Sequence, residues 1–302
     1  MAQGGQVLLS RVTAELVADQ LPAGAGLTDV GMQHLKGLSR AEQVFALVHP
    51  ALRAPSVVAS SPTRLLGGTF VGRDVELSQL GDALDSALGA QGRLVLVAGE
   101  AGIGKTRITE ELANRATVRG VRVVWGRCTE SEGASAYWPW IQVLRAGIDD
   151  LPAEALTALS GQDVAAVGQL LPELAEAHPF QAPPTVHEPE TARLHLYQAV
   201  SDFLRRASRS TALLVVLDDL HWADQASLSL LEFVTRELAG ARVLLVATYR
   251  DVEVHRRHPL SDTLAELVRQ PVTSLVVLRG LNQDQVRRCI AAITVSSRNL
   301  SW

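Results

Sequence analysis

The chain has few cysteines, few aromatic residues and no excess of positive charge, and these shortages limit its structure and its partners. Its 302 residues include two cysteines, Cys128 and Cys289, which lie far apart and form no C-x-x-C pair. This spacing argues against a disulfide framework and against a cysteine zinc site. Aromatic residues make up only 4%, so aliphatic side chains must build the core. A net charge of −4 offers no overall basic face, and we therefore expect no membrane partner and no direct nucleic-acid binding.

Long apolar runs and a secretion signal are also missing. No apolar stretch approaches the ~18 residues that span a bilayer, and the first residues lack a basic segment followed by an apolar one. We therefore expect a cytoplasmic protein. With 47% hydrophobic and 20% charged residues, the composition is otherwise average for a globular protein. The length allows one large domain or two ordinary ones.

The most informative stretch is a glycine-containing loop between an expected strand and an expected helix. The apolar run Leu94–Ala98 leads into the pattern G-x-x-x-x-G-K-T, which ends at Lys105 and Thr106. Gly99 and Gly104 let the backbone turn its N–H groups toward an anion, and the following helix points the positive end of its dipole there. Lys105 suits the outer phosphates and Thr106 suits Mg²⁺, which predicts binding of a nucleoside triphosphate with Mg²⁺. The residues predicted to line the nucleotide here are Gly99, Glu100, Ala101, Gly102, Ile103, Gly104, Lys105, Thr106 and Arg107.

A second chemical signal lies at the end of another expected buried strand. The continuous apolar run Leu213–Leu217 ends in Asp218 and Asp219, and parallel sheets place ligands at the carboxyl ends of their strands. We predict that Asp218 holds Mg²⁺ together with Thr106, directly or through water. We predict that Asp219 orients or deprotonates an attacking water. The two carboxylates are a strong signal because a complete phosphate loop precedes them.

Three further features have both a functional and a structural interpretation. Arg250 follows the apolar run Val243–Thr248, and we expect it to read the charge of a γ-phosphate; the alternative is a surface ion pair with Asp251. His221 can sense the state of the phosphate, but we favour a histidine that satisfies a loop. The stretch Tyr137–Trp140 can stack on a base, but we favour a hydrophobic anchor that fixes a loop against a helix.

The hydrophobic patterns predict an α/β fold: a P-loop NTPase with three α/β/α layers and a mainly parallel sheet, preceded by a small α/β piece. In the small piece, the alternating stretch Gln43–Val48 is typical of an edge strand. The other expected strands cover residues 94–98, 121–125, 213–217, 243–248 and 275–278. The expected helices cover residues 75–90, 107–116, 191–207, 225–238, 260–268 and 283–293, with Asp224 and Asn282 as N-caps.

Four short stretches near the N-terminus occur in the order of a known domain. They are Gly5–Ser10, Leu27–Gly31, His34–Leu38 and Gln43–Pro50. Together they resemble the last part of a class III adenylyl or guanylyl cyclase domain. In that family the metal-binding carboxylates and the transition-state Asn and Arg precede this tail, so the resemblance implies a cyclase remnant over residues 1–53 without catalytic equipment.

A longer set of motifs covers about three quarters of the chain. It consists of Phe70–Arg73, Gly99–Thr106, Gly126–Cys128, Tyr137–Trp140, Leu217–Asp224 and Thr248–Asp251. This set resembles the AAA-type ATPase module of STAND regulators, which include LuxR-type transcription factors and cyclase–ATPase fusions. The resemblance implies an ATP/ADP switch with slow hydrolysis, whose nucleotide state controls self-association through the ATPase domain. It also implies that Val71 and Arg73 approach the base and ribose, that Asp218 and Asp219 form the Walker B pair, and that Arg250 is the sensor arginine.

These resemblances predict the domain organisation. We expect a cyclase remnant at 1–53, a linker at 54–67, the ATPase domain at 68–293 and an unstructured tail at 294–302. The family continues into a helical lid, a winged helix and helical repeats, whereas the last residues here match none of these, so we expect a truncated product. A signal-transducing ATPase is the leading prediction. The alternatives are an active class III cyclase, an ATP-dependent transcriptional regulator and a small-molecule kinase.

Overall fold

The structure is a computed structural model that divides the chain into two compact units, Met1–Thr69 and Phe70–Trp302. It describes residues 7–11, 13, 14, 26–33, 42–48, 70, 72–130, 135–149, 161–177, 189–255 and 258–288. The expected linker, the expected C-terminal tail, Cys289 and Val71 lie outside these residues.

The first unit contains a three-stranded antiparallel sheet. Its strands are β1 (Val7–Ser10), β2 (Gly26–Gln33) and β3 (Glu42–Val48), in the order β1-β3-β2. The prediction that residues 43–48 form an edge strand was wrong, because β3 is the central strand and Leu47 pairs with a residue on either side. Alternation of apolar and polar residues reports the two faces of a strand but not its two edges.

The second unit is built on a five-stranded parallel sheet in the order β5-β6-β7-β4-β8. Its strands are β4 (Arg93–Ala98), β5 (Arg122–Arg127), β6 (Leu213–Asp218), β7 (Val243–Tyr249) and β8 (Thr273–Val277). The predicted parallel sheet is confirmed. One strand, β7, lies between β4 and β6, so its carboxyl end lies between the phosphate loop and the acidic pair.

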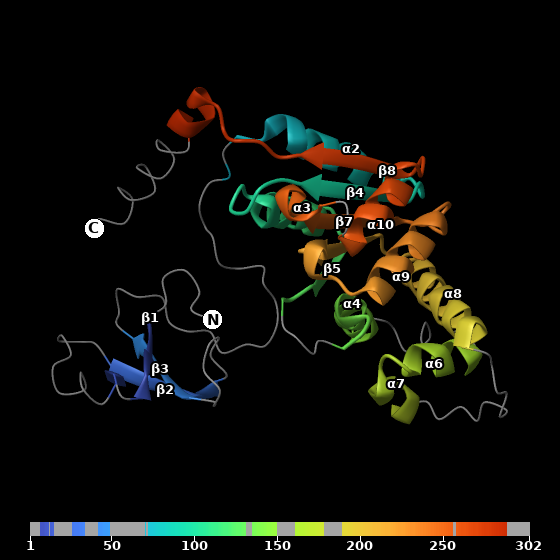
Figure 1. The fold of residues 1–302 in the computed structure, drawn as a ribbon, viewed down its shortest axis with the longest axis horizontal. Coiled ribbons are helices and arrows are strands. Elements are labelled where there is room, and N and C mark those ends of the chain that lie inside the picture. The colour runs from blue at the N-terminus through green and yellow to red at the C-terminus, as the bar shows by residue number, and fades with distance from the viewer. Residues whose placement is uncertain are drawn as a thin grey trace. The chain divides into compact units, whose positions relative to one another are not determined.

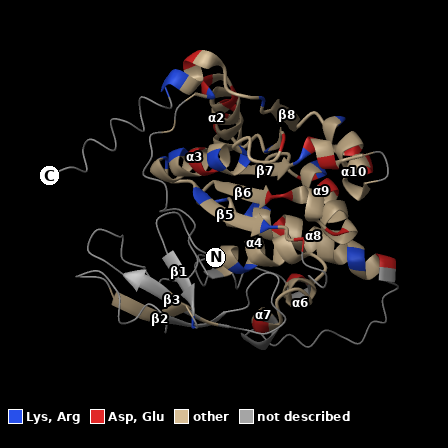
Figure 2. Cartoon of the chain, turned by 60° about the vertical axis from the view of Figure 1, so that its left-hand side comes forward, with Lys and Arg blue, Asp and Glu red and all other residues tan. Residues whose placement is uncertain are grey.

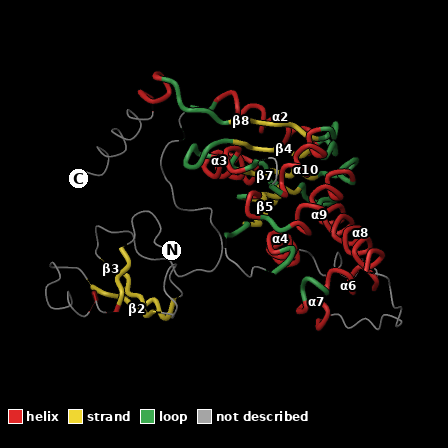
Figure 3. Tube along the Cα trace, viewed as in Figure 1, coloured by secondary structure: helices red, strands yellow, loops and turns green. Residues whose placement is uncertain are grey.

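Helices cover both faces of this sheet and give the predicted three layers (Figure 1). Alternate residues of each strand face opposite layers: Val95 and Val97 pack with α2 and α3, whereas Leu94 and Leu96 pack with the helices of the other face. The helices are α2 (Asp74–Leu88), α3 (Lys105–Val118), α4 (Trp138–Asp149), α6 (Gly161–Gly168), α7 (Pro172–Ala177), α8 (Pro189–Ala207), α9 (Gln225–Arg236) and α10 (Pro259–Val268). Figure 3 shows these helices in red and the strands in yellow.

Charged residues lie mainly on the helices and at the strand ends (Figure 2). Strands β6 and β7 are buried along their whole length, which explains why their sequences read as continuous apolar runs. Among the described helices, none is long and apolar enough to cross a membrane.

Two predicted helix caps are confirmed by hydrogen bonds. Asp224 accepts the backbone N–H of Ser227 at 2.9 Å and so begins α9. Asn282 accepts the N–H of Gln285 at 2.9 Å, and the side chain of Gln285 accepts the N–H of Asn282 at 2.8 Å. Each cap satisfies N–H groups that the first helical turn leaves unpaired.

Candidate functional site

The glycine-rich loop joins β4 to α3, and its backbone carbonyl groups accept hydrogen bonds from Lys105. Gly102 and Gly104 have φ angles of 75° and 104°, in the left-handed region that side chains disfavour. The Lys105 Nζ donates hydrogen bonds to the carbonyl oxygens of Gly99 at 2.9 Å and Glu100 at 2.8 Å. Because an ammonium has three N–H donors, one remains for a ligand. Burial lowers the pKa of Lys105, although the neighbouring Asp219 charge opposes this shift.

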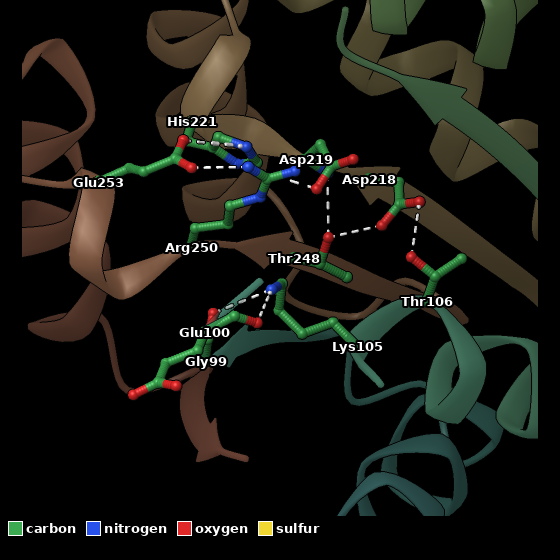
Figure 4. A network of polar contacts seen from close by, with 10 residues as sticks. All are labelled: Gly99, Glu100, Lys105, Thr106, Asp218, Asp219, His221, Thr248, Arg250 and Glu253. Atoms are coloured by element: carbon green, nitrogen blue, oxygen red, sulfur yellow. Dashed lines mark hydrogen bonds and ion pairs between the residues drawn. The ribbon is translucent and has the colours of Figure 1, made fainter. Parts of the chain in front are cut away.

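The loop meets the acidic pair through Thr106 (Figure 4). Its hydroxyl donates to Oδ2 of Asp218 at 3.3 Å, and the Thr248 hydroxyl donates to Oδ1 of the same carboxylate at 2.6 Å. Asp218 is buried at the end of β6. Burial raises its pKa, while the hydrogen bond from Thr248 opposes this rise. The ends of β6 and β7 and the first turn of α3 therefore converge on one carboxylate.

Asp219 turns the chain sharply away from β6. Its backbone is left-handed, with φ 61° and ψ 47°, and its N–H donates to the Thr248 hydroxyl oxygen at 2.9 Å. A left-handed conformation is uncommon outside glycine and requires support from its surroundings. Thr248 gives that support because its hydroxyl accepts from Asp219 and donates to Asp218. The Thr248 hydroxyl therefore fixes the backbone of Asp219 relative to the Asp218 carboxylate.

Arg250 has a different partner from the one that its sequence neighbourhood suggested. Its Nη1 donates to Oε1 of Glu253 at 2.6 Å, and its guanidinium carbon lies 4.9 Å from the centre of the Trp222 ring. Asp251, the ion-pair partner considered above, instead accepts the backbone N–H of Val252. The alternative interpretation, a surface ion pair between Arg250 and Asp251, was therefore wrong, since Arg250 pairs with Glu253.

We favoured a role for His221 as a hydrogen-bonding partner within a loop, and that interpretation was wrong. Its side chain is fully buried, and neither ring nitrogen makes a hydrogen bond with any group among the described residues. Its Nε2 lies 3.4 Å from Oε2 of Glu253, and its Nδ1 lies 3.9 Å from Oδ1 of Asp219. Burial lowers the pKa of His221 to about 4, so the ring is neutral near pH 7 and these contacts are not ion pairs.

The turn at the start of the second unit contacts the phosphate loop through Arg73. Arg73 is buried, and its Nη2 donates to the Ile103 carbonyl oxygen at 3.2 Å while its Nη1 pairs with Glu76 at 3.1 Å. Its predicted contact with the base and ribose stays a prediction. Val71, predicted beside it, lies outside the described residues. On the first turn of α3, the Arg107 guanidinium carbon lies 5.6 Å from the centre of the Phe70 ring.

The Tyr137–Trp140 segment is an anchor, as favoured from the sequence. The Trp140 side chain is fully buried, and its indole N–H donates to the Ser227 carbonyl oxygen on α9 at 3.0 Å. Gly126 on β5 allows the close approach of this segment, since a Cβ there would lie 2.8 Å from the carbonyl carbon of Pro139. The anchor therefore ties α4 to both β5 and α9.

The residues at Asp218 fit the chemistry of a magnesium ion. Mg²⁺ in nucleotide sites takes one or two protein oxygens and completes its octahedron with phosphate oxygens and water. The Thr106 hydroxyl and the Asp218 carboxylate supply such oxygens side by side. Among the residues that the structure describes, no group of three or more His, Cys, Asp or Glu side chains could hold a metal without a ligand. A metal here would therefore depend on the phosphates.

Sequence reasoning did not select Thr248, Trp222 or Glu253 as site residues. A signal for Thr248 existed, since it is the polar residue at the end of a continuous apolar run that parallel pairing places beside the other strand ends. No comparable signal marked Glu253, because its contact with Arg250 depends on the turn after β7.

The fold and the geometry of this site define a class. A glycine-rich loop between the first strand and helix of a parallel sheet, with a lysine and a threonine facing an acidic strand end, is the arrangement of a P-loop nucleotide-binding protein. The model of the AAA ATPase domain matches residues 69–246. The chain belongs to this family, and nucleotide binding is what membership implies.

Similar proteins are found among curated sequences. An uncharacterized protein of Rhizobium meliloti is 26% identical over 282 residues, which cover 87% of this chain and 25% of that protein. An uncharacterized protein of Mycobacterium tuberculosis is 45% identical over 85 residues, which cover 26% of this chain and 30% of that protein. The chain thus spans about a quarter to a third of the length of these relatives.

Solved structures resemble the chain at low sequence identity. AMPPCP-bound DnaA from Aquifex aeolicus is 17% identical, with a TM-score of 0.37, and the match covers 78% of this chain and 54% of that one. Domain III of the Thermotoga maritima replication initiation protein DnaA is 11% identical, with a TM-score of 0.38, and the match covers 76% and 72%.

Proposed function

We propose that the second unit binds ATP with Mg²⁺ and hydrolyses it slowly, as an ATP/ADP switch. The observation that carries this proposal is the 3.3 Å contact between Thr106 and Asp218. It joins the phosphate loop to the acidic strand end, although the two residues are 112 positions apart. A bound Mg²⁺ and triphosphate would supply a polarised terminal phosphoryl group at this junction.

The chain's own residues would then hold that group and a water. Lys105 can turn its third N–H donor to the outer phosphates, and the loop N–H groups face the same anion. Thr106 and Asp218 would hold the metal. The Asp219 carboxylate, whose backbone is fixed by Thr248, would accept a hydrogen bond from the attacking water and take its proton. Arg250 would offset the charge of the γ-phosphate.

The switch role rests on the resemblance and on the position of Arg250. A triphosphate would place its terminal phosphate between Lys105 and Arg250 and a diphosphate would not, so ATP and ADP would bind with different contacts. We infer that this difference controls self-association of the unit. For the first unit we retain the cyclase-tail proposal; a purified chain that makes no cyclic nucleotide from ATP would support it, and formation of cyclic nucleotide would contradict it.

The central test removes the lysine. Lys105→Ala deletes a charged donor to phosphate, and we expect ATP affinity to fall by about 10- to 100-fold. The matched control is Arg115→Ala on the same helix, which removes an exposed cation paired with Glu111. Isothermal titration calorimetry gives the affinities, and a thermal melt shows whether the unit still folds. Unchanged ATP affinity in folded Lys105→Ala would overturn the site assignment.

A further inference from the structure

The guanidinium of Arg250 is held on two sides. Glu253 accepts a hydrogen bond from Nη1 at 2.6 Å, and the ring of Trp222 lies under the guanidinium, 4.9 Å from its central carbon. Figure 4 shows Arg250 between Glu253 on one side and Asp219 on the other. An arginine carries five N–H donors in a rigid plane, and the described contact with Glu253 uses one of them.

Glu253 is itself anchored. It ends the short turn η3 (Asp251–Glu253), and its backbone N–H donates to the Arg250 carbonyl oxygen at 3.3 Å. Its second carboxylate oxygen lies 3.4 Å from Nε2 of the buried His221. The hydrogen bond from Arg250 lowers the pKa of Glu253, so the carboxylate remains charged near pH 7. The turn therefore places the carboxylate within reach of Arg250 and beside the buried ring.

The arginine held in this way acts on the nucleotide site. It directly follows β7, the strand between β4, which leads into the phosphate loop, and β6, which ends at the acidic pair. Figure 4 shows it beside Asp219, in the same site as Lys105. An arginine without such supports loses side-chain entropy when it is fixed on a ligand. Contacts that fix it beforehand reduce that loss.

We propose that Glu253 is a positioning residue: it holds Arg250 against Trp222 with the remaining guanidinium donors directed at the terminal phosphate of a triphosphate. The inference rests on the proposed function, because it requires Arg250 to contact that phosphate. It makes Glu253 a determinant of ATP against ADP selectivity without contacting either nucleotide. The opposite role, in which Glu253 competes with the phosphate for Arg250, would make the same ion pair an obstacle to ATP binding.

The experiment is a double-mutant cycle on the full chain. Affinities for ATP and ADP, both with Mg²⁺, are measured for wild type, Glu253→Gln, Arg250→Ala and the double variant. We expect Glu253→Gln to weaken ATP binding about threefold or more, because a charge-assisted hydrogen bond is replaced by a weaker neutral one. ADP affinity should not change. In the Arg250→Ala background, Glu253→Gln should have no further effect.

The matched control is Glu266→Gln, which breaks a surface ion pair with Arg269. That pair has the same sequence spacing as the pair of Arg250 and Glu253. Tighter ATP binding in Glu253→Gln would overturn the proposal and identify a competitor. Equal losses with and without Arg250 would also overturn it, since the effect would then not pass through the arginine. An unchanged ratio of ATP to ADP affinity in Arg250→Ala would instead refute the role of Arg250 under the proposed function.

Discussion

Thr248 links the acidic pair to the rest of the site, and its replacement by valine tests that link. Valine has nearly the same shape but cannot hydrogen-bond. Thr248→Val removes the 2.6 Å hydrogen bond to Asp218 and leaves the Asp219 N–H without the acceptor that it now has at 2.9 Å. Because Thr248 is fully buried, water cannot readily replace either partner.

The expected loss follows from these two contacts. A hydrogen bond to a charged group contributes about 1.5–3 kcal/mol, and an unpaired buried donor costs about 1–3 kcal/mol. The contributions are not fully additive, since both pass through one hydroxyl. We therefore expect the free energy of unfolding to fall by about 3 kcal/mol. ATP affinity in the presence of Mg²⁺ should fall as well, because Asp218 loses the contact that orients it.

Urea unfolding followed by circular dichroism measures the first quantity, and calorimetric titration measures the second. The matched control is Thr235→Val. Thr235 is also fully buried, but its hydroxyl donates to the Leu231 carbonyl of its own helix at 2.7 Å. That carbonyl is already a helix acceptor, so we expect a loss of less than about 1 kcal/mol. Equal stabilities of the two variants would refute the role given to Thr248.

Three further predictions address the chemistry, the pH dependence and the packing. Asp219→Asn should keep ATP binding but slow phosphate release about 10²- to 10⁴-fold, since the amide cannot take a proton from water. Burial lowers the pKa of His221 from 6.5 to about 4, so its contribution to stability is present above about pH 6.5 and lost as the pH falls toward 4, up to about 3 kcal/mol. Gly126→Ala should destabilise the unit by several kcal/mol, because the new methyl group would overlap the backbone of Pro139.

Each of these has a control. Asp251→Asn changes a nearby carboxylate that caps a backbone N–H, and similar phosphate release in both variants would contradict the role of Asp219. His221→Phe should flatten the stability profile between pH 4 and 6.5; an unchanged slope would show that another group titrates there. Gly81→Ala, with nothing within 4 Å of the added methyl, should stabilise α2 slightly. A Gly126→Ala variant as stable as Gly81→Ala would contradict the close approach.

The sequence by itself determined the fold class and predicted the candidate site. The loop from Gly99 to Thr106 and the strand that ends in Asp218 are local patterns, in which the order of residues specifies both the turn and its chemistry. The sequence predicted the buried strands because a parallel sheet covered on both faces requires continuous apolar runs. It also predicted the caps Asp224 and Asn282, because a cap acts within one helical turn.

Only the tertiary structure decided which strands are neighbours and which side chains meet. It showed that residues 42–48 form a central strand, since strand order depends on two partners that a pattern in one strand does not encode. It replaced Asp251 by Glu253 as the partner of Arg250, and it placed the buried ring of His221 against that same carboxylate. These pairings depend on where the turn after β7 directs its side chains. Local residue order predicted which groups stand at the strand ends, whereas packing decided which of them hold one another in place.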